Sequence, residues 1–298
     1  MFKGTFTALV TPFKDGVVDT KAYNELIERQ IAAGIEGILP VGTTGESPTL
    51  SNEEHIRVIE IAIRRGKGKT VVLAGTGSNC TREAIDLTQK AQELGADASL
   101  LVCPYYNKPS QEGLYQHFMA IAKSTTLPLV LYSIPGRCVI EIAPETLARL
   151  ARDAKNIVGL KEAGGKPERI TQLRKVLPDS FQIMSGDDGQ TIPFMKLGAT
   201  GVISVASNLI PAEVKKMVDY AAQGDMPAAQ REEKKLAAIF RDLFIEPNPV
   251  PVKEAMAALG WMEPDVRLPL CRMEEKTRKK LFETMSKLGL TAKSDSSS

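Results

Sequence analysis

Eight short apolar runs recur along the first part of this chain, and segments with the periodicity of amphipathic helices separate each run from the next. Each run is mostly apolar on both faces, as is typical of parallel strands that helices cover on both sides. Eight strands, each followed by a helix, over about 225 residues form the pattern of a (β/α)₈ barrel. The sequence therefore predicts an α/β protein with a (β/α)₈ TIM barrel. The predicted strands lie at residues 4–10, 37–41, 70–74, 98–102, 128–132, 157–161, 181–185 and 200–205.

The competing fold is an open, doubly wound sheet, which usually carries a glycine-rich turn after its first strand. Here that turn reads Thr11-Pro12-Phe13-Lys14-Asp15-Gly16, which is no dinucleotide fingerprint, so the barrel is favoured. The phosphate loop of nucleotide-binding proteins and the G-x-S-x-G turn of serine hydrolases are absent from the sequence as well.

Polar residues at segment ends predict helix caps. Ser51 and Glu54 form a capping-box pattern before an apolar stripe, and Thr81 and Ser110 resemble further N-terminal caps. The adjacent Asp187-Asp188 could be a carboxylate pair for metal binding or acid–base work, but helix capping is favoured.

The pattern changes to helices alone after residue 225. Three helices are predicted, at 227–245, 252–259 and 274–288. We expect a catalytic barrel over 1–225, a C-terminal extension of three helices over 226–290 and a disordered, serine-rich tail over 291–298.

Composition excludes several classes of function. The net charge is only +2, so no strong field is expected to attract nucleic acid or an anionic membrane. No run of about 18 apolar residues could span a bilayer, and the N-terminus lacks the apolar stretch of a signal peptide. The four cysteines form no C-x-x-C pair, which favours free thiols in a reducing cytoplasm. The two histidines, His55 and His117, lie far apart, so neither a metal nor a cofactor is expected.

The segment from Asn156 to Gly164 carries the strongest chemical signal. Its apolar run indicates a short buried strand that ends at Lys161. In a (β/α)₈ barrel, catalytic residues collect at the carboxyl ends of the strands. Burial there would remove hydration from the lysine, favour its neutral amine and make it a nucleophile. The alternative is a lysine that extends from the strand end into solvent.

Other polar residues follow other predicted strands, so a barrel would gather them at the same mouth. The segment 42–47 offers two hydroxyls and several backbone N–H groups, which can hold a carboxylate or simply shape a tight turn. Tyr132 can transfer protons or fill the core, and Arg137 can grip a carboxylate or form a surface ion pair. Tyr105 and Tyr106 follow another strand. With the strand-end lysine, these groups could form an imine with a keto acid, whose enamine then adds to an aldehyde.

These motifs resemble, in order and spacing, the signatures of the pyruvate-dependent class I aldolase and lyase superfamily. The similarity to its dihydrodipicolinate synthase branch is close and covers about residues 1–290. The matching segments are 42–46, 104–115, 132–137, 159–163, 185–188, 201–205 and 246–253. The resemblance implies a lyase that condenses pyruvate with L-aspartate 4-semialdehyde in the diaminopimelate route to lysine, and that works as a homo-oligomer, a dimer or a tetramer.

The resemblance also implies a role for each matching residue. Lys161 resembles the Schiff-base lysine, and Tyr132 resembles the tyrosine that transfers protons. Thr44 resembles the threonine that links Tyr132 to a second tyrosine, matched here by Tyr106, which in the family comes from the neighbouring subunit. The other matches concern the substrates: Thr43 at the pyruvate carboxylate, Arg137 at the aspartate semialdehyde, and Gly186 and Ile203 as backbone contacts near the lysine.

Three positions depart from the branch. Ser133 stands where asparagine is usual, Val139 where glycine is common, and Gly164-Gly165 replaces a Thr/Ser-Gly pair. They flank the site without removing a reacting group, and they could alter the loop that carries Arg137.

The resemblance further implies feedback inhibition by lysine at a dimer interface. Glu83 would pair with the α-amino group of the effector, Tyr105 and Asn79 would bind its carboxylate, and His55 would bind near its side-chain amine. Asn52 departs from the histidine of many bacterial members, and the alternative is that all these residues only cap helices and fill the interface. The full set of matching positions is Ser47, Leu50, Asn52, His55, Asn79, Glu83 and Tyr105.

Sibling enzymes are the nearest alternatives to the synthase. Sialic acid lyases typically carry Gly-Ser-Thr-Gly-Glu where this chain has Gly42-Thr43-Thr44-Gly45-Glu46, and they lack a match to Arg137. Keto-deoxy-sugar aldolases share the lysine and the tyrosine. An inactive barrel that serves as a binding protein is disfavoured, because every reacting side chain is present.

Overall fold

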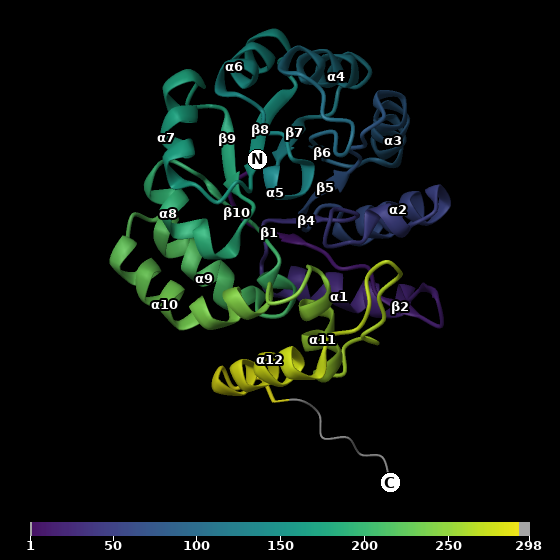
Figure 1. Ribbon diagram of the computed structural model, residues 1–298, viewed down its shortest axis with the longest axis vertical. Coiled ribbons are helices and arrows are strands. Elements are labelled where there is room, and N and C mark those ends of the chain that lie inside the picture. Colours follow the sequence, from purple (N-terminus) through teal and green to yellow (C-terminus); the bar gives the residue numbers. More distant parts are fainter. Residues whose placement is uncertain (1, 292–298) are drawn as a thin grey trace.

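The computed structural model describes residues 2–291, which include a closed barrel of eight parallel strands (Figure 1). Strands that follow one another in the barrel pair side by side, and β1 closes the ring by pairing with both β4 and β10. All eight predicted strands and the predicted TIM barrel are confirmed. The strands are β1 Gly4–Ala8, β4 Gly37–Leu39, β5 Val71–Gly75, β6 Ala98–Val102, β7 Leu129–Ser133, β8 Ile157–Glu162, β9 Gln182–Ser185 and β10 Gly201–Ser204.

Helices surround the strands (Figure 1). One apolar cluster, which includes Phe6, Leu100 and Met184, fills the inside of the barrel, and a larger cluster joins the strands to the helices. Burial against these two clusters explains why the strands are apolar on both faces. The helices of the barrel are α1 Thr20–Ala32, α2 Asn52–Gly66, α3 Thr81–Leu94, α4 Gln111–Lys123, α5 Pro135–Cys138, α6 Pro144–Asp153, α7 Pro167–Val176, α8 Thr191–Lys196 and α9 Pro211–Ala222.

Two of the three predicted caps begin helices. The capping box at 51–54 is present at the start of α2, with hydrogen bonds of 3.2 and 3.0 Å in its two directions. Ser110 caps α4 through a 3.2 Å hydrogen bond from a backbone N–H. The prediction for Thr81 is wrong, because Cys80 is the N-cap residue of α3. The Thr81 hydroxyl instead pairs with His117 Nδ1 on α4 at 2.9 Å, a tertiary contact that the local pattern does not contain.

The turn after β1 contains a short hairpin that was not predicted from the sequence. Its strands, β2 (Phe13–Lys14) and β3 (Val17–Val18), pair antiparallel. Asp15 and Gly16 between them have φ angles of 52° and 78°, which suit a two-residue hairpin turn. The Asp-Gly pair was the sequence signal for this turn.

Three helices follow the barrel, as predicted: α10 (Met226–Asp242), α11 (Val250–Ala258) and α12 (Glu275–Lys287). α10 packs along α9, and α12 packs against α10 and α11 (Figure 1). Between α10 and α12, the buried Asp242 accepts a 2.7 Å hydrogen bond from Thr284. The division into domains after residue 225 stays a prediction, and the predicted disordered tail lies, apart from Thr291, outside the described residues.

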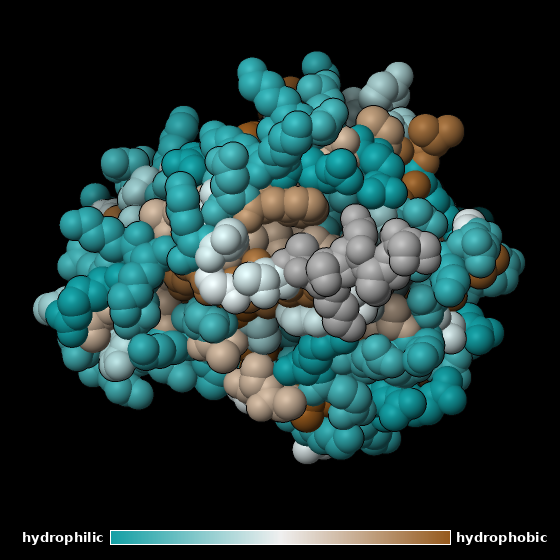
Figure 2. Space-filling model, turned by 90° about the horizontal axis from the view of Figure 1, so that it is seen from below, coloured by the Kyte–Doolittle hydropathy of each residue, from teal (hydrophilic) through white to brown (hydrophobic). Residues whose placement is uncertain are grey.

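Hydrophilic residues cover most of the face seen from below, on the side of α11 and α12 (Figure 2). Apolar residues on this face show near its centre and in smaller patches toward its edges. No helix within residues 2–291 is long and apolar enough to cross a membrane.

Candidate active site

Lys161 lies near the carboxyl end of β8, with only 5% of its surface exposed. Tyr132 on the neighbouring β7 is its partner in register, and Lys161 Nζ lies 4.2 Å from the centre of the Tyr132 ring. On the other side, a Cβ atom at Gly186 would lie 3.0 Å from Lys161 Cε, so the lysine needs a glycine there. The structure brings these three residues together, and the alternative of a lysine extended into solvent is wrong.

Burial lowers the pKa of the Lys161 ammonium to about 7, because the charged form loses its hydration. The Arg137 charge lowers this pKa further, whereas the Asp188 carboxylate raises it. Near neutral pH the Lys161 side chain is therefore available as an uncharged amine, which is nucleophilic.

Tyr132 keeps its proton at neutral pH, because burial raises the pKa of its phenol to about 12. A hydrogen bond with Thr43 and the charge of Arg137 act in the opposite direction on this pKa. A protonated phenol next to an amine can give up a proton and take it back during a reaction.

The loop that carries Thr43 and Thr44 follows β4 and is held from two sides. From the turn after β1, Thr11 Oγ1 donates a hydrogen bond to Gly45 O at 2.7 Å. From the segment between α10 and α11, Asn248 Nδ2 donates to Thr44 Oγ1 at 3.0 Å. Thr44 is buried, so the C-terminal extension supplies a fixed partner to its hydroxyl group.

A buried ion pair behind this loop was not predicted from the sequence. Lys253 on α11 is fully buried, and its Nζ donates to Glu46 Oε1 at 2.6 Å and to Thr11 O at 2.9 Å. The backbone N–H of Arg267 donates to the other carboxylate oxygen of Glu46 at 3.1 Å. Burial lowers the pKa of Lys253 to about 8, although Glu46 acts to raise it. A lysine within the apolar segment 250–256 was the sequence signal, because a buried lysine needs a partner.

Arg137 lies on α5, directly after β7. Its guanidinium donates a hydrogen bond to Asn248 O at 3.3 Å, and its charge lowers the pKa of both Lys161 and Tyr132. α5 ends at Cys138, and the next residue, Val139, has a φ of 67° and is 70% exposed. Since this left-handed backbone favours glycine, the departure at Val139 strains the loop that carries the arginine.

We expect Val139→Gly to raise the free energy of unfolding by about 1 kcal/mol. A side chain with a Cβ in the left-handed region costs about 1–2 kcal/mol, and the greater freedom of glycine in the unfolded chain offsets part of the gain. The valine is exposed, so little apolar contact is lost. Urea titration measures the change, with Val139→Ala as a control that should gain less. An unchanged or lower denaturation midpoint for the glycine variant would contradict the strain.

The two aspartates after β9 accept hydrogen bonds from backbone N–H groups, as the capping interpretation expects. Asp187 accepts from Gly189 at 2.8 Å, at the start of the short helix η2 (Asp188–Gln190). Asp188 accepts from two N–H groups just after β10, at 3.0 and 2.9 Å, and burial raises its pKa to about 6. Ile203 on β10 is fully buried inside the barrel.

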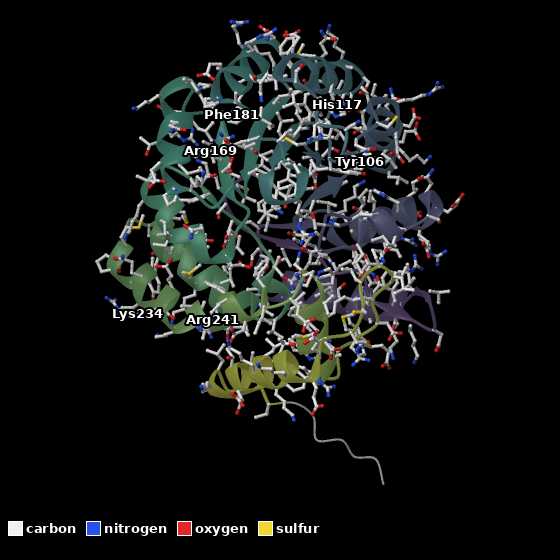
Figure 3. All side chains as sticks on the ribbon, viewed as in Figure 1. Tyr106, His117, Arg169, Phe181, Lys234 and Arg241 are labelled. Carbon is white, nitrogen blue, oxygen red and sulfur yellow. The ribbon has the colours of Figure 1, made fainter. Side chains whose placement is uncertain are left out.

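Tyr106 differs from the other candidate catalytic residues, Lys161, Tyr132 and Thr44, in that it is exposed and they are buried. It is 87% exposed, and it occupies a loop after β6 with a φ of 73°. In Figure 3 it lies on the side of α2 and α3, across the molecule from Arg169.

The residues of the implied lysine site gather around the starts of α2 and α3. Asn79 Nδ2 donates to Tyr105 O at 3.1 Å. The buried His55 on α2 pairs with Gly75 O at 2.8 Å, and the charge of Glu83 acts to raise the pKa of its imidazole. Asn52 and Glu83 line one surface pocket of about 490 Å³. The remaining two members, Ser47 and Leu50, lie just before α2.

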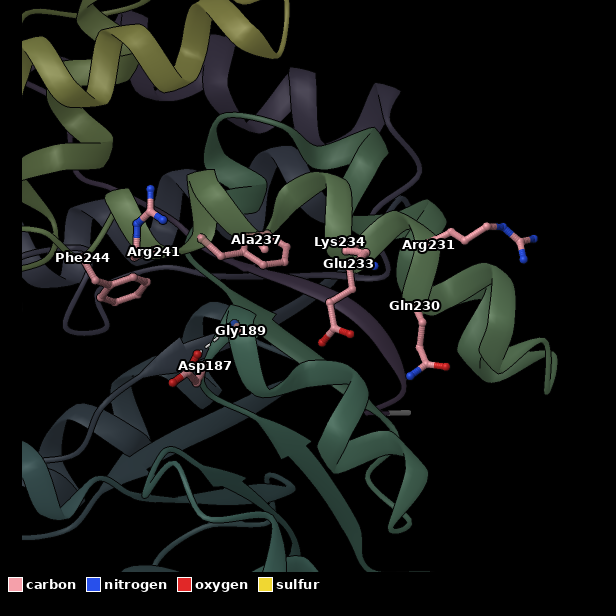
Figure 4. A pocket seen from close by; sticks show the side chains of 10 residues that line it. Asp187, Gly189, Gln230, Arg231, Glu233, Lys234, Ala237, Arg241 and Phe244 are labelled. Carbon is pink, nitrogen blue, oxygen red and sulfur yellow. Dashed lines mark hydrogen bonds between the residues drawn. The ribbon is translucent and has the colours of Figure 1, made fainter.

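A second pocket, of about 900 Å³, was not predicted and lies between the loop after β9 and α10 (Figure 4). The carboxylates of Asp187 and Glu233 face this space, whereas Arg231 points away from it. Because Asp187 directly follows Gly186, the pocket borders on the surroundings of Lys161.

Across the barrel and the three helices that follow it, the chain is similar to proteins of a single family. Residues 1–288 match the model of the Dihydrodipicolinate synthetase family. A 4-hydroxy-tetrahydrodipicolinate synthase of Endomicrobium trichonymphae is 49% identical over 97% of this chain and 99% of its own length. The solved structure of the same synthase from Methylacidiphilum fumariolicum SolV has 49% identity and a TM-score of 0.95, covering 98% of this chain and 100% of that one. The dihydrodipicolinate synthase (DHDPS) from Cyanidioschyzon merolae, solved with lysine bound, is 41% identical with a TM-score of 0.93. The match covers 97% of this chain and 99% of that one.

Proposed function

Because the chain belongs to the dihydrodipicolinate synthetase family and is a lyase of the 4-hydroxy-tetrahydrodipicolinate synthase type, we propose that Lys161 is its Schiff-base nucleophile. The single observation that supports this role most is the buried amine, with a pKa of about 7, beside the protonated phenol of Tyr132. The amine adds to the keto carbon of pyruvate, and water leaves to give an imine. Loss of a methyl proton gives an enamine, whose carbon adds to the aldehyde of L-aspartate 4-semialdehyde. The reaction belongs to the diaminopimelate route to lysine.

In this proposal the neighbouring residues transfer protons and bind the two substrates. Tyr132 gives and takes protons, and the Thr43 hydroxyl with the backbone of its loop binds the pyruvate carboxylate. Arg137 holds the carboxylate of the second substrate with its guanidinium fork. Gly186 and Ile203 contribute backbone contacts around the lysine.

A threonine passes protons between Tyr132 and Tyr106 of the partner subunit in this proposal; the sequence indicated Thr44, but the hydrogen bond of Tyr132 with Thr43 favours Thr43 for this role. Support comes from the exposure of Tyr106, which leaves it available to a second chain. The active form is therefore a homo-oligomer, at least a dimer, and the proposed location is the cytoplasm.

Turnover with the two substrates tests the proposed function. The protein should consume pyruvate only when L-aspartate 4-semialdehyde is present, and a sugar aldehyde such as N-acetylmannosamine should not replace the semialdehyde. Turnover of pyruvate with the sugar aldehyde, and none with the semialdehyde, would instead identify a sibling aldolase.

The rate of imine formation should follow the titration of Lys161. Below pH 7 each pH unit should lower the rate about tenfold, because only the uncharged amine attacks, and the rate should level off above pH 8. Trapping with pyruvate and cyanoborohydride over short times measures this rate. Since Arg137 lowers the pKa of Lys161 and Asp188 raises it, Arg137→Ala should move the midpoint up and Asp188→Asn should move it down. A midpoint near the ordinary lysine value would contradict a desolvated amine.

We also propose that lysine inhibits the enzyme at the start of α3. The lysine-bound relative supports this, and so does the pocket lined by Asn52 and Glu83. Glu83 would bind the α-amino group of the effector, and Tyr105 next to Tyr106 would pass the effect to the proton relay.

Glu83→Ala should weaken lysine inhibition about tenfold or more, because a charge-assisted hydrogen bond contributes roughly 1.5–3 kcal/mol. The measurement is the lysine concentration that halves turnover at fixed pyruvate. Asp86→Ala is the matched control, because Asp86 lies on the same helix and lines the same pocket but is not in the implied set. Equal inhibition of the parent and the Glu83→Ala protein, or none of the parent at millimolar lysine, would defeat the assignment.

A further inference from the structure

A buried guanidinium joins the carboxyl end of β8 to the loop that follows α5. It belongs to Arg169, which lies near the start of α7 and is only 5% exposed (Figure 3). Its Nε donates to Glu162 Oε2 at 2.7 Å, and its Nη1 lies 3.1 Å from Glu141 Oε2. Its Nη2 donates to Ile142 O at 2.7 Å. Each nitrogen of the guanidinium is therefore engaged, one by the strand and two by the loop.

Glu162 fixes the strand end of this contact. It directly follows Lys161, is fully buried, and its other carboxylate oxygen accepts a 2.7 Å hydrogen bond from the Gly164 N–H. Burial raises the pKa of the Glu162 carboxyl group, and the charge of Arg169 acts to lower it. Because a buried carboxylate that loses its cation is strongly destabilising, Glu162 holds the guanidinium in place.

The loop after α5 is held from a second helix as well. Gln111 at the start of α4 donates from Nε2 to Glu141 O at 2.8 Å, and its Oε1 accepts from the Ala143 N–H at 2.9 Å. The loop begins at Val139, whose left-handed backbone is strained. Strained backbone persists only where its surroundings hold it, so these contacts fix the path of the chain just after Arg137.

The positions that depart from the usual pattern of the family surround this contact. Ser133 pairs in register with Glu162, and its buried hydroxyl has no partner within residues 2–291. A Cβ atom at Gly164 would lie 2.7 Å from Glu162 Oε1 and 3.3 Å from Glu141 Oε1, so a side chain there would displace a carboxylate. Val139 begins the loop. The departures thus gather at the link between β8 and the loop, and not at the reacting groups.

Arg137 depends on support from this loop. It lies on α5, a helix of only four residues, which is too short to be stable by itself. Cys138 holds the helix on one side, through a 3.3 Å hydrogen bond from its Sγ to Cys103 O. The Arg137 guanidinium donates a hydrogen bond of 3.3 Å to Asn248 O, which leaves other donors for a substrate carboxylate.

Resting on the proposed function, we propose that Arg169 is a positioning residue for the second substrate. By tying the loop after α5 to β8, it keeps Arg137 where its fork meets the carboxylate of L-aspartate 4-semialdehyde. Lys161 pairs in register with Tyr132 and Met184, which face the inside of the barrel, so Glu162 faces outward. Imine formation therefore does not pass through this contact, and loss of the contact affects the second substrate alone.

Arg169→Lys tests the proposal without leaving a buried carboxylate unpaired. Lysine keeps a charge next to Glu162, but a single ammonium cannot maintain the planar contact with strand and loop together. The KM for L-aspartate 4-semialdehyde should rise on the order of tenfold, because small misplacements of a binding group have effects of this size or larger. The rate of adduct formation with pyruvate and cyanoborohydride should stay within about twofold, because only binding of the second substrate is lost.

Glu141→Ala is a milder variant that keeps the buried pair of Arg169 and Glu162 intact. Its side chain is 42% exposed, so the fold tolerates its removal. The same KM should rise about threefold, the size expected for a partly exposed ion pair.

Arg174→Lys is the matched control. Arg174 lies on the same helix and likewise donates to backbone carbonyl groups, Gly198 O at 3.2 Å and Phe181 O at 2.9 Å. These carbonyls lie just before β10 and β9, at the end of the barrel opposite to Lys161. The KM for the semialdehyde should therefore equal that of the parent.

A double variant separates positioning from a general loosening of the fold. In the Arg137→Ala background, Arg169→Lys should change the KM for the semialdehyde by no more than about twofold, because an effect that passes through Arg137 vanishes with it. A merely structural role would weaken both backgrounds alike.

The outcomes distinguish this inference from the proposed function itself. If the parent does not turn over the two substrates, the proposed function fails. If the parent is active but neither Arg169→Lys nor Glu141→Ala raises the KM for the semialdehyde, or if the rise is the same without Arg137, the positioning role of Arg169 is overturned. Adduct formation slowed by the same factor as the KM rises would overturn it too, because the contact would then act on Lys161.

Discussion

Lys161→Ala is expected to abolish the reducible pyruvate adduct and to lower turnover about 10⁴-fold or more. The covalent route needs an amine at this position, and alanine supplies no nucleophile. The change leaves the barrel intact, because alanine keeps the backbone through which position 161 pairs with Tyr132 on β7 and Met184 on β9. Adduct formation is read from the intact mass after borohydride reduction, and turnover from the coupled assay with both substrates.

Lys253 is the informative control for this substitution, because within residues 2–291 it is the other buried lysine with a lowered pKa. Its amine is bound by Glu46 and by Thr11 O, so it is held as an ion-pair partner and not as a nucleophile. Lys253→Met should weaken the fold by about 3–5 kcal/mol, the usual cost of breaking a buried ion pair, yet still form the adduct at Lys161. Turnover of Lys161→Ala within tenfold of the parent would rule out the assigned nucleophile.

Tyr132→Phe and Tyr106→Phe should each lower turnover about 10²–10⁴-fold. Each change removes one hydroxyl of the proposed relay and keeps the ring, so the loss reports proton transfer and not packing. Tyr132 is buried beside the lysine, whereas Tyr106 is almost fully exposed in one chain. A large effect at such an exposed residue is expected only if it works in a neighbouring subunit.

Mixing two inactive proteins tests this sharing of sites. Tyr106→Phe lacks the relay tyrosine, and Lys161→Ala lacks the nucleophile, so a hybrid dimer contains one site with both groups intact. Activity should return on mixing, up to about a quarter of the parent value if exchange is random and each half-site acts alone. Proven subunit exchange without recovered activity would show that Tyr106 serves its own chain.

The barrel was predictable because its strands are buried on both faces and each helix is marked by its own periodicity. The position of Lys161 was predictable for a related reason, since a buried strand that ends in a lysine places an amine at the end of the barrel where catalytic groups lie. Its lowered pKa then follows from its burial.

What could not be predicted involves partners far apart in the chain. Asn248 and Thr44 are 204 residues apart, and Lys253 and Glu46 are 207 apart, so no local pattern pairs them. Thr81 was misassigned for the same reason, because its hydroxyl bonds to a different helix.

The central claim is that the amine of Lys161 is the group that takes pyruvate, and peptide mapping of the reduced adduct tests it most directly. The unaltered protein is incubated with pyruvate, reduced with borohydride, digested and sequenced by mass spectrometry. We predict one modified lysine, at position 161, in yield that rises with pH through about 7. Modification of Lys253 or of a surface lysine with Lys161 unmodified would contradict the account.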